Sequence, residues 1–212
     1  MPPTLEDQLD TIQTRLGETL EVFAIANAIN ERADPSVDPD LNKAINRLGG
    51  FWQASLLAYQ TTLFMGINAI LDKENGDSAT LYSAMRALTA TTPGILPVDL
   101  EQKLDTIRNR YKKLRHKLFG HNDMERQKYV DEFNASGFTW PSLESDLREL
   151  AYIFKILFEA VRGRAIPSVQ DAPRLKFPYQ AHVERAQRDI ATLLGELLVS
   201  PRAQPDPLRQ AP

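Results

Sequence analysis

The segment RNRYKKLRHKLFGH, residues 108–121, combines the side chains best suited to phosphate chemistry in this chain. It holds six basic residues, no acidic residue and two of the three histidines. A neutral histidine can take the proton of a ribose 2′-hydroxyl because its pKa lies near neutral pH. A guanidinium can hold a phosphate through two parallel hydrogen bonds and stabilise charge on its oxygens. Arg115 and His121 are therefore candidates for metal-independent RNA cleavage through the RNA's own 2′-oxygen.

Basic residues form a stripe on the helix expected to precede this pair. Arg108, Lys112 and Arg115 fall on one face of an ideal helix, at steps of four and three. The stripe predicts contacts with phosphates, which makes Arg108 and Lys112 candidate substrate-binding residues. The alternative is a solvated basic face that suits the negative end of the helix dipole, and a charge run alone favours this alternative.

The spacing of the histidines limits what they can do together. His116 and His121 are separated by about 140° on a straight helix, so they cannot share a metal ion, and we expect neither metal nor cofactor. Arg115 and His121 are separated by about 120° and roughly 9 Å of rise. Either the helix breaks at Gly120, or two subunits supply the pair to one cleft. The second option predicts a two-fold homodimer with residues 108–123 near the axis.

Composition narrows the class of protein. The chain has 212 residues, a formal net charge of −3 and no cysteine. The lack of cysteine excludes disulfides, thiolate catalysis and cysteine-bound zinc. The first residues, MPPTLEDQLD, show neither the basic nor the apolar region of a secretory signal. These features predict a cytoplasmic protein.

The most apolar stretch, FWQASLLAYQTTLFMGINAIL at residues 51–71, predicts a buried helix. Gln53, Gln60 and Asn68 interrupt it, so we expect no membrane span. Phe51 and Trp52 at its start are candidates for a protein-binding face, but the sequence favours core packing for both.

Apolar residues follow helical spacing along nearly the whole chain. This pattern predicts an all-α, up-and-down helical bundle of about five or six helices, with one domain over residues 4–199 and a disordered tail over 200–212. Gly49 and Gly50 predict a kink or a close helix crossing inside the second helix. The first expected helix starts after Thr4, whose hydroxyl caps it with Asp7 three residues later. The second and third span Asp40–Asp72 and Ser78–Leu88. The fourth follows a cap at Asp99, the fifth begins at Pro141, and the last spans 179–199.

An apolar seam runs along the helix that leads to the candidate pair. Leu104, Ile107, Tyr111, Leu114 and Leu118 recur at steps of three and four, and position 121 continues the series. We expect Leu114 and Leu118 to be buried, and Lys112 and Lys113 to be exposed. The series points His121 toward the bundle or a cleft at its end, although a core histidine satisfied by hydrogen bonds has the same spacing.

Two stretches resemble the HEPN superfamily. RHKLFGH, residues 115–121, matches the R-x(4–6)-H signature of that superfamily, with a polar residue after the arginine. RHKLFGHND and the upstream ILDKENGDSATLYSAMRAL are similar to the AbiU-type branch, named for abortive-infection proteins. That branch has an Arg-polar-Lys-x-Phe-small-His-x-Asp segment, and an Asp before a polar loop that leads into a short Ser-Leu-Tyr helix.

The resemblance implies a helical homodimer whose two motifs face one another across a cleft. Many HEPN proteins are metal-independent endoribonucleases of toxin–antitoxin or anti-phage systems. On this basis Arg115 and His121 form the catalytic pair and His116 orients them. Lys117, Asp72 and Asp123 become candidate substrate contacts, and an antitoxin protein becomes a possible partner.

One position of this chain differs from the pattern of a subgroup of the superfamily. The resemblance also leaves functions other than RNA cleavage open. Toxins silenced by a nucleotidyltransferase carry Tyr where this chain has Asp123, so that form of regulation is not expected. Some HEPN domains bind RNA or nucleotides without cleaving them, and others act only through protein contacts.

Overall fold

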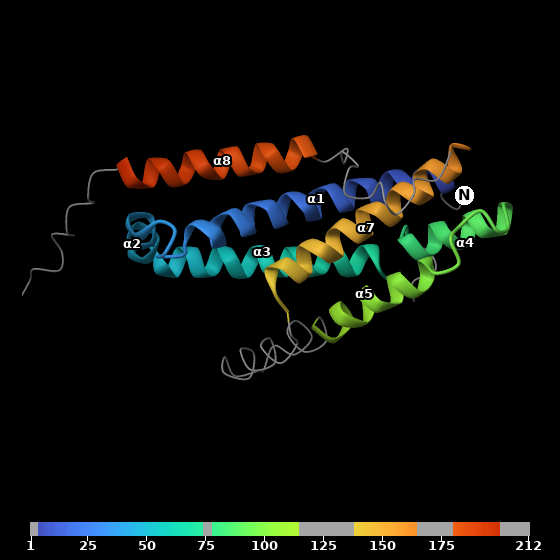
Figure 1. Ribbon diagram of the computed structural model, residues 1–212, viewed down its shortest axis with the longest axis horizontal. Coiled ribbons are helices and arrows are strands. Elements are labelled where there is room, and N and C mark those ends of the chain that lie inside the picture. Colours follow the sequence, from blue (N-terminus) through green and yellow to red (C-terminus); the bar gives the residue numbers. More distant parts are fainter. Residues whose placement is uncertain (1–3, 74–77, 115–137, 165–179, 200–212) are drawn as a thin grey trace, which may run out of the picture.

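The computed structural model describes residues 4–73, 78–114, 138–164 and 180–199 (Figure 1). These residues contain seven α-helices and no strand, so the predicted all-α helical bundle is confirmed. The helices are α1 (Leu5–Arg32), α2 (Pro39–Arg47), α3 (Gly49–Ile70), α4 (Leu81–Thr91), α5 (Leu100–Leu114), α7 (Trp140–Val161) and α8 (Gln180–Val199).

The start of α1 follows from local side-chain chemistry. The Thr4 hydroxyl accepts a hydrogen bond from the Asp7 amide at 3.2 Å, and the Asp7 carboxylate accepts one from the Thr4 amide at 2.9 Å. This reciprocal pair is the capping box that the sequence predicts. Thr80 and Thr139 cap α4 and α7 in the same manner.

The second predicted helix is in fact two helices. Asp38 caps α2, which ends at Arg47, and α3 begins at Gly49 after a break at Leu48. A side chain placed at Gly49 or Gly50 would meet nothing within 4 Å, so none of the described helices crosses α3 closely there. The close crossing lies at Gly66 instead, where an added Cβ would collide with the Thr19 hydroxyl of α1.

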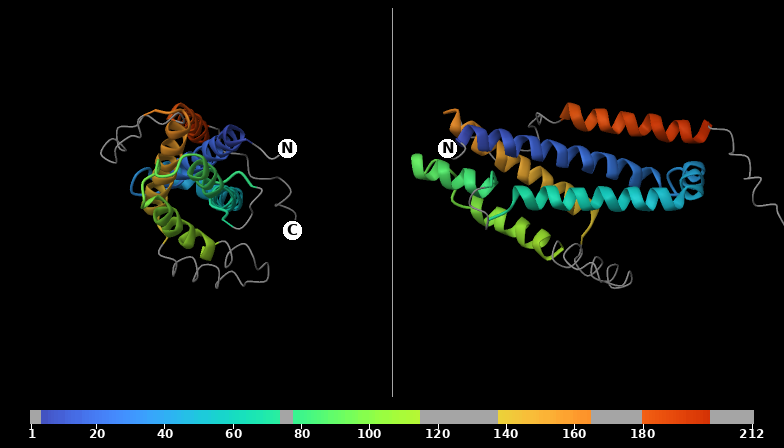
Figure 2. Two further views of the ribbon diagram at one scale, coloured as in Figure 1. Left: turned by 90° about the vertical axis from the view of Figure 1, so that its right-hand side faces the viewer. Right: turned by 180° about the vertical axis from the view of Figure 1, so that it is seen from behind.

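The long helix α1 runs through most of the molecule, and α3, α4, α7 and α8 pack against it (Figures 1 and 2). It contacts α3 along its length and α8 at one end, while α4 and α7 cover its other end. The larger core draws on α1, α3, α4, α5 and α7, with Ile12, Leu16, Phe64, Ile67, Tyr111 and Leu150 among its members. The smaller core joins α1, α2, α3 and α8 through Ile29, Leu41, Ile45, Trp52, Ile190 and Leu194.

The apolar seam of α5 faces the larger core. Leu104, Ile107 and Tyr111 are all buried, as the sequence predicts. The side chains of Leu114 and Lys113, and all of Leu118, lie outside the described residues. Lys112 is half-buried rather than exposed, because the aliphatic stem of a lysine beside an apolar seam can cover that surface.

The two neighbouring aromatics at the start of α3 separate. Trp52 is 5% exposed and belongs to the smaller core, as expected. Phe51 is 62% exposed, so its expected core role is wrong. Adjacent positions on a helix differ by about 100°, and the bundle covers only the Trp52 side of α3.

Candidate functional site on helix α5

The structure covers the first part of the predicted site. Arg108, Lys112 and Asp72 belong to the described residues, and all three are half-buried. The remaining predicted site residues lie outside the described residues: Arg115, His116, Lys117, His121 and Asp123. The geometry of the site is therefore built from α5, whose last described residue immediately precedes Arg115.

A cluster of charged side chains holds α5 on one side. The Lys73 ammonium lies 2.9 Å from the Glu101 carboxylate and 3.2 Å from that of Asp105. The Tyr82 hydroxyl donates a hydrogen bond to Asp105 at 2.7 Å, and the Lys73 nitrogen lies 4.9 Å from the centre of the Tyr82 ring. The cluster joins α5 to α4 and to the residues that follow α3. Lys73 and Tyr82 both belong to the upstream stretch that carries the family resemblance.

The charges in this cluster are fixed near neutral pH. Hydrogen bonds from Tyr82 and Lys73 lower the pKa of Asp105, and the Arg108 charge adds to this effect. Pairing with Glu101 and Asp105 raises the pKa of Lys73. Burial, followed by the hydrogen bond to Asp105, raises the pKa of Tyr82. None of the three groups changes its charge near pH 7, so they connect helices rather than transfer protons.

The basic stripe is partly built into this cluster. Arg108 lies one turn from Asp105, and its charge acts on both Asp105 and Tyr82. The Arg108 side chain is half-buried, so it keeps partial access to solvent. Because Arg108 and Lys112 are both half-buried, they differ from a fully solvated basic face.

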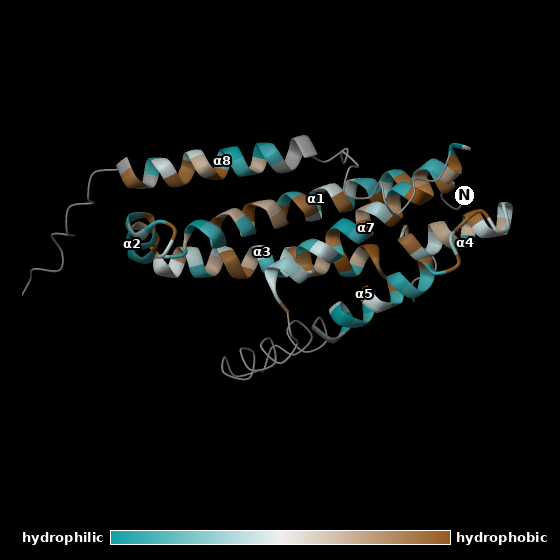
Figure 3. Ribbon diagram, in the orientation of Figure 1, coloured by the Kyte–Doolittle hydropathy of each residue, from teal (hydrophilic) through white to brown (hydrophobic). Residues whose placement is uncertain are grey.

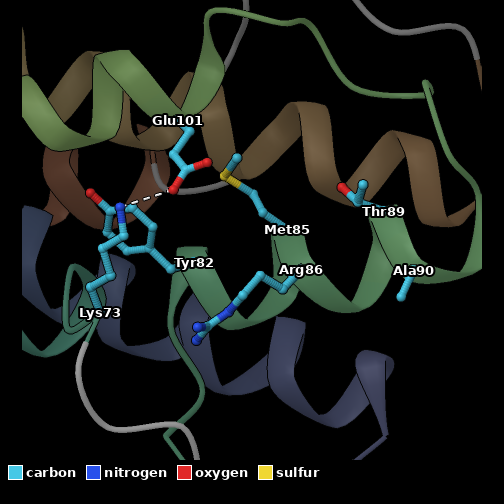
Figure 4. Close-up of a pocket in the computed structure, with 7 residues that line it drawn as sticks. All are labelled: Lys73, Tyr82, Met85, Arg86, Thr89, Ala90 and Glu101. Atoms are coloured by element: carbon cyan, nitrogen blue, oxygen red, sulfur yellow. Dashed lines mark ion pairs between the residues drawn. The ribbon is translucent and has the colours of Figure 1, made fainter.

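A shallow cavity of about 290 Å³ opens beside the cluster (Figure 4). Lys73, Tyr82 and Glu101 line one end of it, and α4 supplies the rest, including Met85 and Arg86. The charge of Lys73 is balanced by two carboxylates, which leaves Arg86 as the cation of the cavity able to attract an anion. A single exposed guanidinium is a weak phosphate site.

A second cluster holds α5 against α7. The Arg110 guanidinium pairs with the Asp146 carboxylate of α7 at 2.5 Å, and the Tyr111 hydroxyl donates to the same oxygen at 2.9 Å. Burial and the nearby Asp146 charge raise the pKa of Tyr111. Arg110 is one of the six cations of the basic segment, so at least this cation stabilises the fold.

The sequence analysis did not identify Asp105 and Asp146, the two acidic residues whose ion pairs hold α5. Asp146 had a detectable signal, since it stands at a core position of α7, three residues after Leu143 and four before Leu150. An acidic residue in an apolar series requires a buried partner. Asp105 had no comparable signal, because a charged residue beside a seam position is common on any amphipathic helix.

Two further observations concern the described residues as a whole. They contain no group of three or more His, Asp or Glu side chains that could hold a metal ion. None of the described helices combines the length and the apolar character that a bilayer crossing requires.

The chain was compared with protein-family models, with curated proteins and with solved structures. None of the three comparisons gave a match. The arrangement of α5 and its partners is therefore interpreted from its own chemistry.

Proposed function

We propose that this protein is a metal-independent endoribonuclease of the HEPN type, acting in a toxin–antitoxin or anti-phage system. His121 removes the proton of a ribose 2′-hydroxyl, and Arg115 stabilises charge on the phosphate. The 2′-oxygen then forms a bond to phosphorus while the bond from phosphorus to the 5′-oxygen breaks, and the leaving 5′-oxygen takes a proton from water. The products are a 2′,3′-cyclic phosphate and a 5′-hydroxyl end.

The observation that carries the proposal is the R-x5-H motif directly after α5. Two ion-pair clusters hold this helix, one through Asp105 and one through Asp146. Catalysis of this kind depends on orientation, and the helix that precedes the motif in the sequence is fixed on both sides. The basic residues that precede the motif suit an RNA backbone.

The other predicted residues take supporting roles in this proposal. His116 orients the catalytic pair, while Arg108, Lys112 and Lys117 bind phosphates. Asp72 and Asp123 contact the substrate. The proposal assumes a cytoplasmic homodimer that an antitoxin protein can neutralise, and the reaction requires no cofactor.

The test is RNA cleavage by the purified chain in the presence of EDTA. Wild type should yield cyclic-phosphate ends, and Arg115→Ala and His121→Ala should lose this activity while retaining their helical content. Arg86→Ala removes one exposed cation from α4 and serves as the control that should cleave normally.

Two outcomes would contradict the proposal in different ways. If His121→Ala cleaves as well as wild type, the catalytic assignment is wrong. If wild type binds RNA but yields no product, the protein is a non-catalytic RNA-binding HEPN-like domain, which is the alternative from the sequence.

A further inference from the structure

Helix α8 lies on the outside of the bundle, on the side of α1 that is turned away from α5 (Figures 1 and 2). Among the described helices it packs mainly against α1 and also against α2. Three of its described side chains are buried: Ala186 at 4%, Ile190 at 8% and Leu194 at 0% exposure. They recur at steps of four, so α8 meets the bundle along one narrow apolar line.

Most of the remaining described surface of α8 is exposed. Leu193 and Leu198 are each 47% exposed, although both are leucines. Figure 3 shows hydrophilic and hydrophobic residues mixed along the helix. In contrast, α7 has 22 residues and buries eleven of its side chains. Since burial of apolar surface is the main source of stability, α8 is held less firmly than α7.

The described charged residues of α8 add little to its attachment. Four of them are exposed and, within the described part of the chain, form no ion pair: Arg185, Arg188, Asp189 and Glu196. By comparison, ion pairs with Asp105 and Asp146 hold α5, and Glu149 of α7 pairs with Lys103 of α5. The contact of α8 with α1 and α2 is therefore mainly apolar.

The apolar line of α8 covers the smaller core. Two residues of α8, Ile190 and Leu194, pack there with residues of three other helices: Ile29, Leu41, Ile45 and Trp52. The buried indole N–H of Trp52 donates to no acceptor among the described residues. A buried donor without an acceptor destabilises the packing around it. The smaller core is therefore less stable than its apolar content alone indicates.

We propose that α8 is a separable unit of the fold, which detaches from α1 and α2 as a whole while the larger core stays folded. Different parts of a protein open with different free energies, and an element with few buried contacts opens before the main core. The larger core contains no described residue of α8, so release of α8 leaves it intact.

In this proposal α8 acts as a strap over the apolar surface of the smaller core. When it is docked, the surface is covered, and when it is released, Ile29, Leu41 and Ile45 become accessible. The proposal is independent of the ribonuclease function, because Asp72, Arg108 and Lys112 are not members of the smaller core. It also requires no second copy of the chain.

Thiol labelling of single-cysteine variants tests the proposal. The chain contains no cysteine, so an introduced thiol is the only one that a thiol reagent can modify. Ala186→Cys on α8 and Ala151→Cys on α7 are matched probes, because both positions are buried alanines, 4% and 2% exposed. A buried thiol reacts only after the structure opens, so Ala186→Cys should react at least about 100-fold faster than Ala151→Cys.

The dependence on urea separates release of one helix from global unfolding. Release of α8 exposes little surface, so the labelling rate of Ala186→Cys should change little at low urea concentrations. The rate of Ala151→Cys should rise steeply, because this position opens with the larger core. If the two thiols react at the same rate with the same urea dependence, α8 opens only with the whole bundle and the proposal is wrong.

A second substitution links the opening to the apolar line. Ile190→Ala should speed the labelling of Ala186→Cys by about tenfold or more and leave that of Ala151→Cys unchanged. Leu193→Ala is the control on the same helix, since this leucine is half exposed, and it should change either rate by less than about twofold. An equal effect of Ile190→Ala on both probes would place α8 in one cooperative unit with α7.

Hydrogen exchange of the unmodified chain needs no substitution. The backbone amides of residues 186–194 should share one protection factor, and they should exchange before the amides of α7. Protection that falls gradually toward the ends of α8 would indicate fraying and would contradict release as a unit. A thiol at position 186 that reacts as fast as free cysteine would show that α8 is not docked, which also overturns the proposal.

Discussion

Arg110 on α5 and Asp146 on α7 form an ion pair in which the two partners have very different exposure. The Arg110 side chain is 37% exposed, whereas that of Asp146 is 9% exposed. A carboxylate in such a position is stable only when donors satisfy it, and the Tyr111 hydroxyl supplies the second donor at 2.9 Å. Asp146 therefore fixes the rotation of α5 just before the predicted catalytic motif.

Removing the Asp146 carboxylate should destabilise the fold. Asp146→Ala leaves the buried Tyr111 hydroxyl without its acceptor and breaks the ion pair, so we expect a loss of about 2–4 kcal/mol. Asp146→Asn keeps an acceptor oxygen and should cost less. Urea unfolding measures both losses.

The surface pair on the same helix provides the control. Arg148 lies 2.6 Å from Glu144, and both side chains are well exposed. Glu144→Ala should cost no more than about 0.5 kcal/mol. If Asp146→Ala lowers the free energy of unfolding as little as Glu144→Ala does, Asp146 does not hold α5.

The second prediction concerns acid stability and Asp105. The folded pKa of Asp105 is lowered from its ordinary value of 3.8, so its contribution to stability is present above about pH 4. It is lost as the pH falls through the folded pKa. Lys73 acts in the opposite direction, since its raised pKa gives a contribution that is present below 10.5 and is lost at higher pH.

Asp105→Asn measures this contribution. The Asp105 side chain is 40% exposed, so solvent screening keeps the expected loss at pH 7 to about 1 kcal/mol or less. The difference between wild type and variant should shrink when unfolding is measured at about pH 3. An equal difference at both pH values would mean that the carboxylate charge does not contribute.

How far the sequence predicted this structure depended on the range of the interactions involved. The start of α1 was predictable because Thr4 and Asp7 satisfy each other within three residues. A kink at Gly49 and Gly50 was one of two expected alternatives and lies beside the break at Leu48. The separation into two helices was not predicted, because apolar spacing continues through the break and the Asp38 cap of α2 was not recognised. The partner of Arg110 was also missed, since Asp146 lies 36 residues away and meets it only through tertiary packing. Of the candidate site, the sequence supplied the basic residues of α5 but not the acids that hold the helix.

The third prediction compares two glycines of α3. Gly66→Ala would push a Cβ against the Thr19 hydroxyl, which is buried and donates to the Arg15 carbonyl at 2.7 Å. We expect a loss of about 1–3 kcal/mol despite the better helix propensity of alanine. Gly50→Ala meets nothing within 4 Å and should be neutral or stabilising by up to about 1 kcal/mol.

A double variant identifies the cause of the Gly66 effect. Thr19→Ala removes the hydroxyl that the new methyl group would strike, so Gly66→Ala should cost less in that background than in wild type. Thermal unfolding of the four chains gives the coupling. Equal costs in the two backgrounds would place the strain elsewhere.

The last prediction concerns RNA binding by the basic face of α5, and it follows from the proposed function. Each lysine that contacts a phosphate releases counterions, which contributes about 0.7 to the slope of log affinity against log salt for a single strand. Replacing both Lys112 and Lys113 with Gln should weaken binding and flatten the slope by up to about 1.4. Lys103→Gln is the matched control on the same helix, because Lys103 pairs with Asp99 at 3.1 Å and Glu149 at 3.6 Å. It removes the same kind of charge, yet it should leave the slope unchanged. Fluorescence anisotropy with a labelled single-stranded RNA over a salt series measures the affinity of wild type and of both variants. If Lys103→Gln flattens the slope equally, the change reflects the net charge of the protein and not phosphate contacts by Lys112 and Lys113.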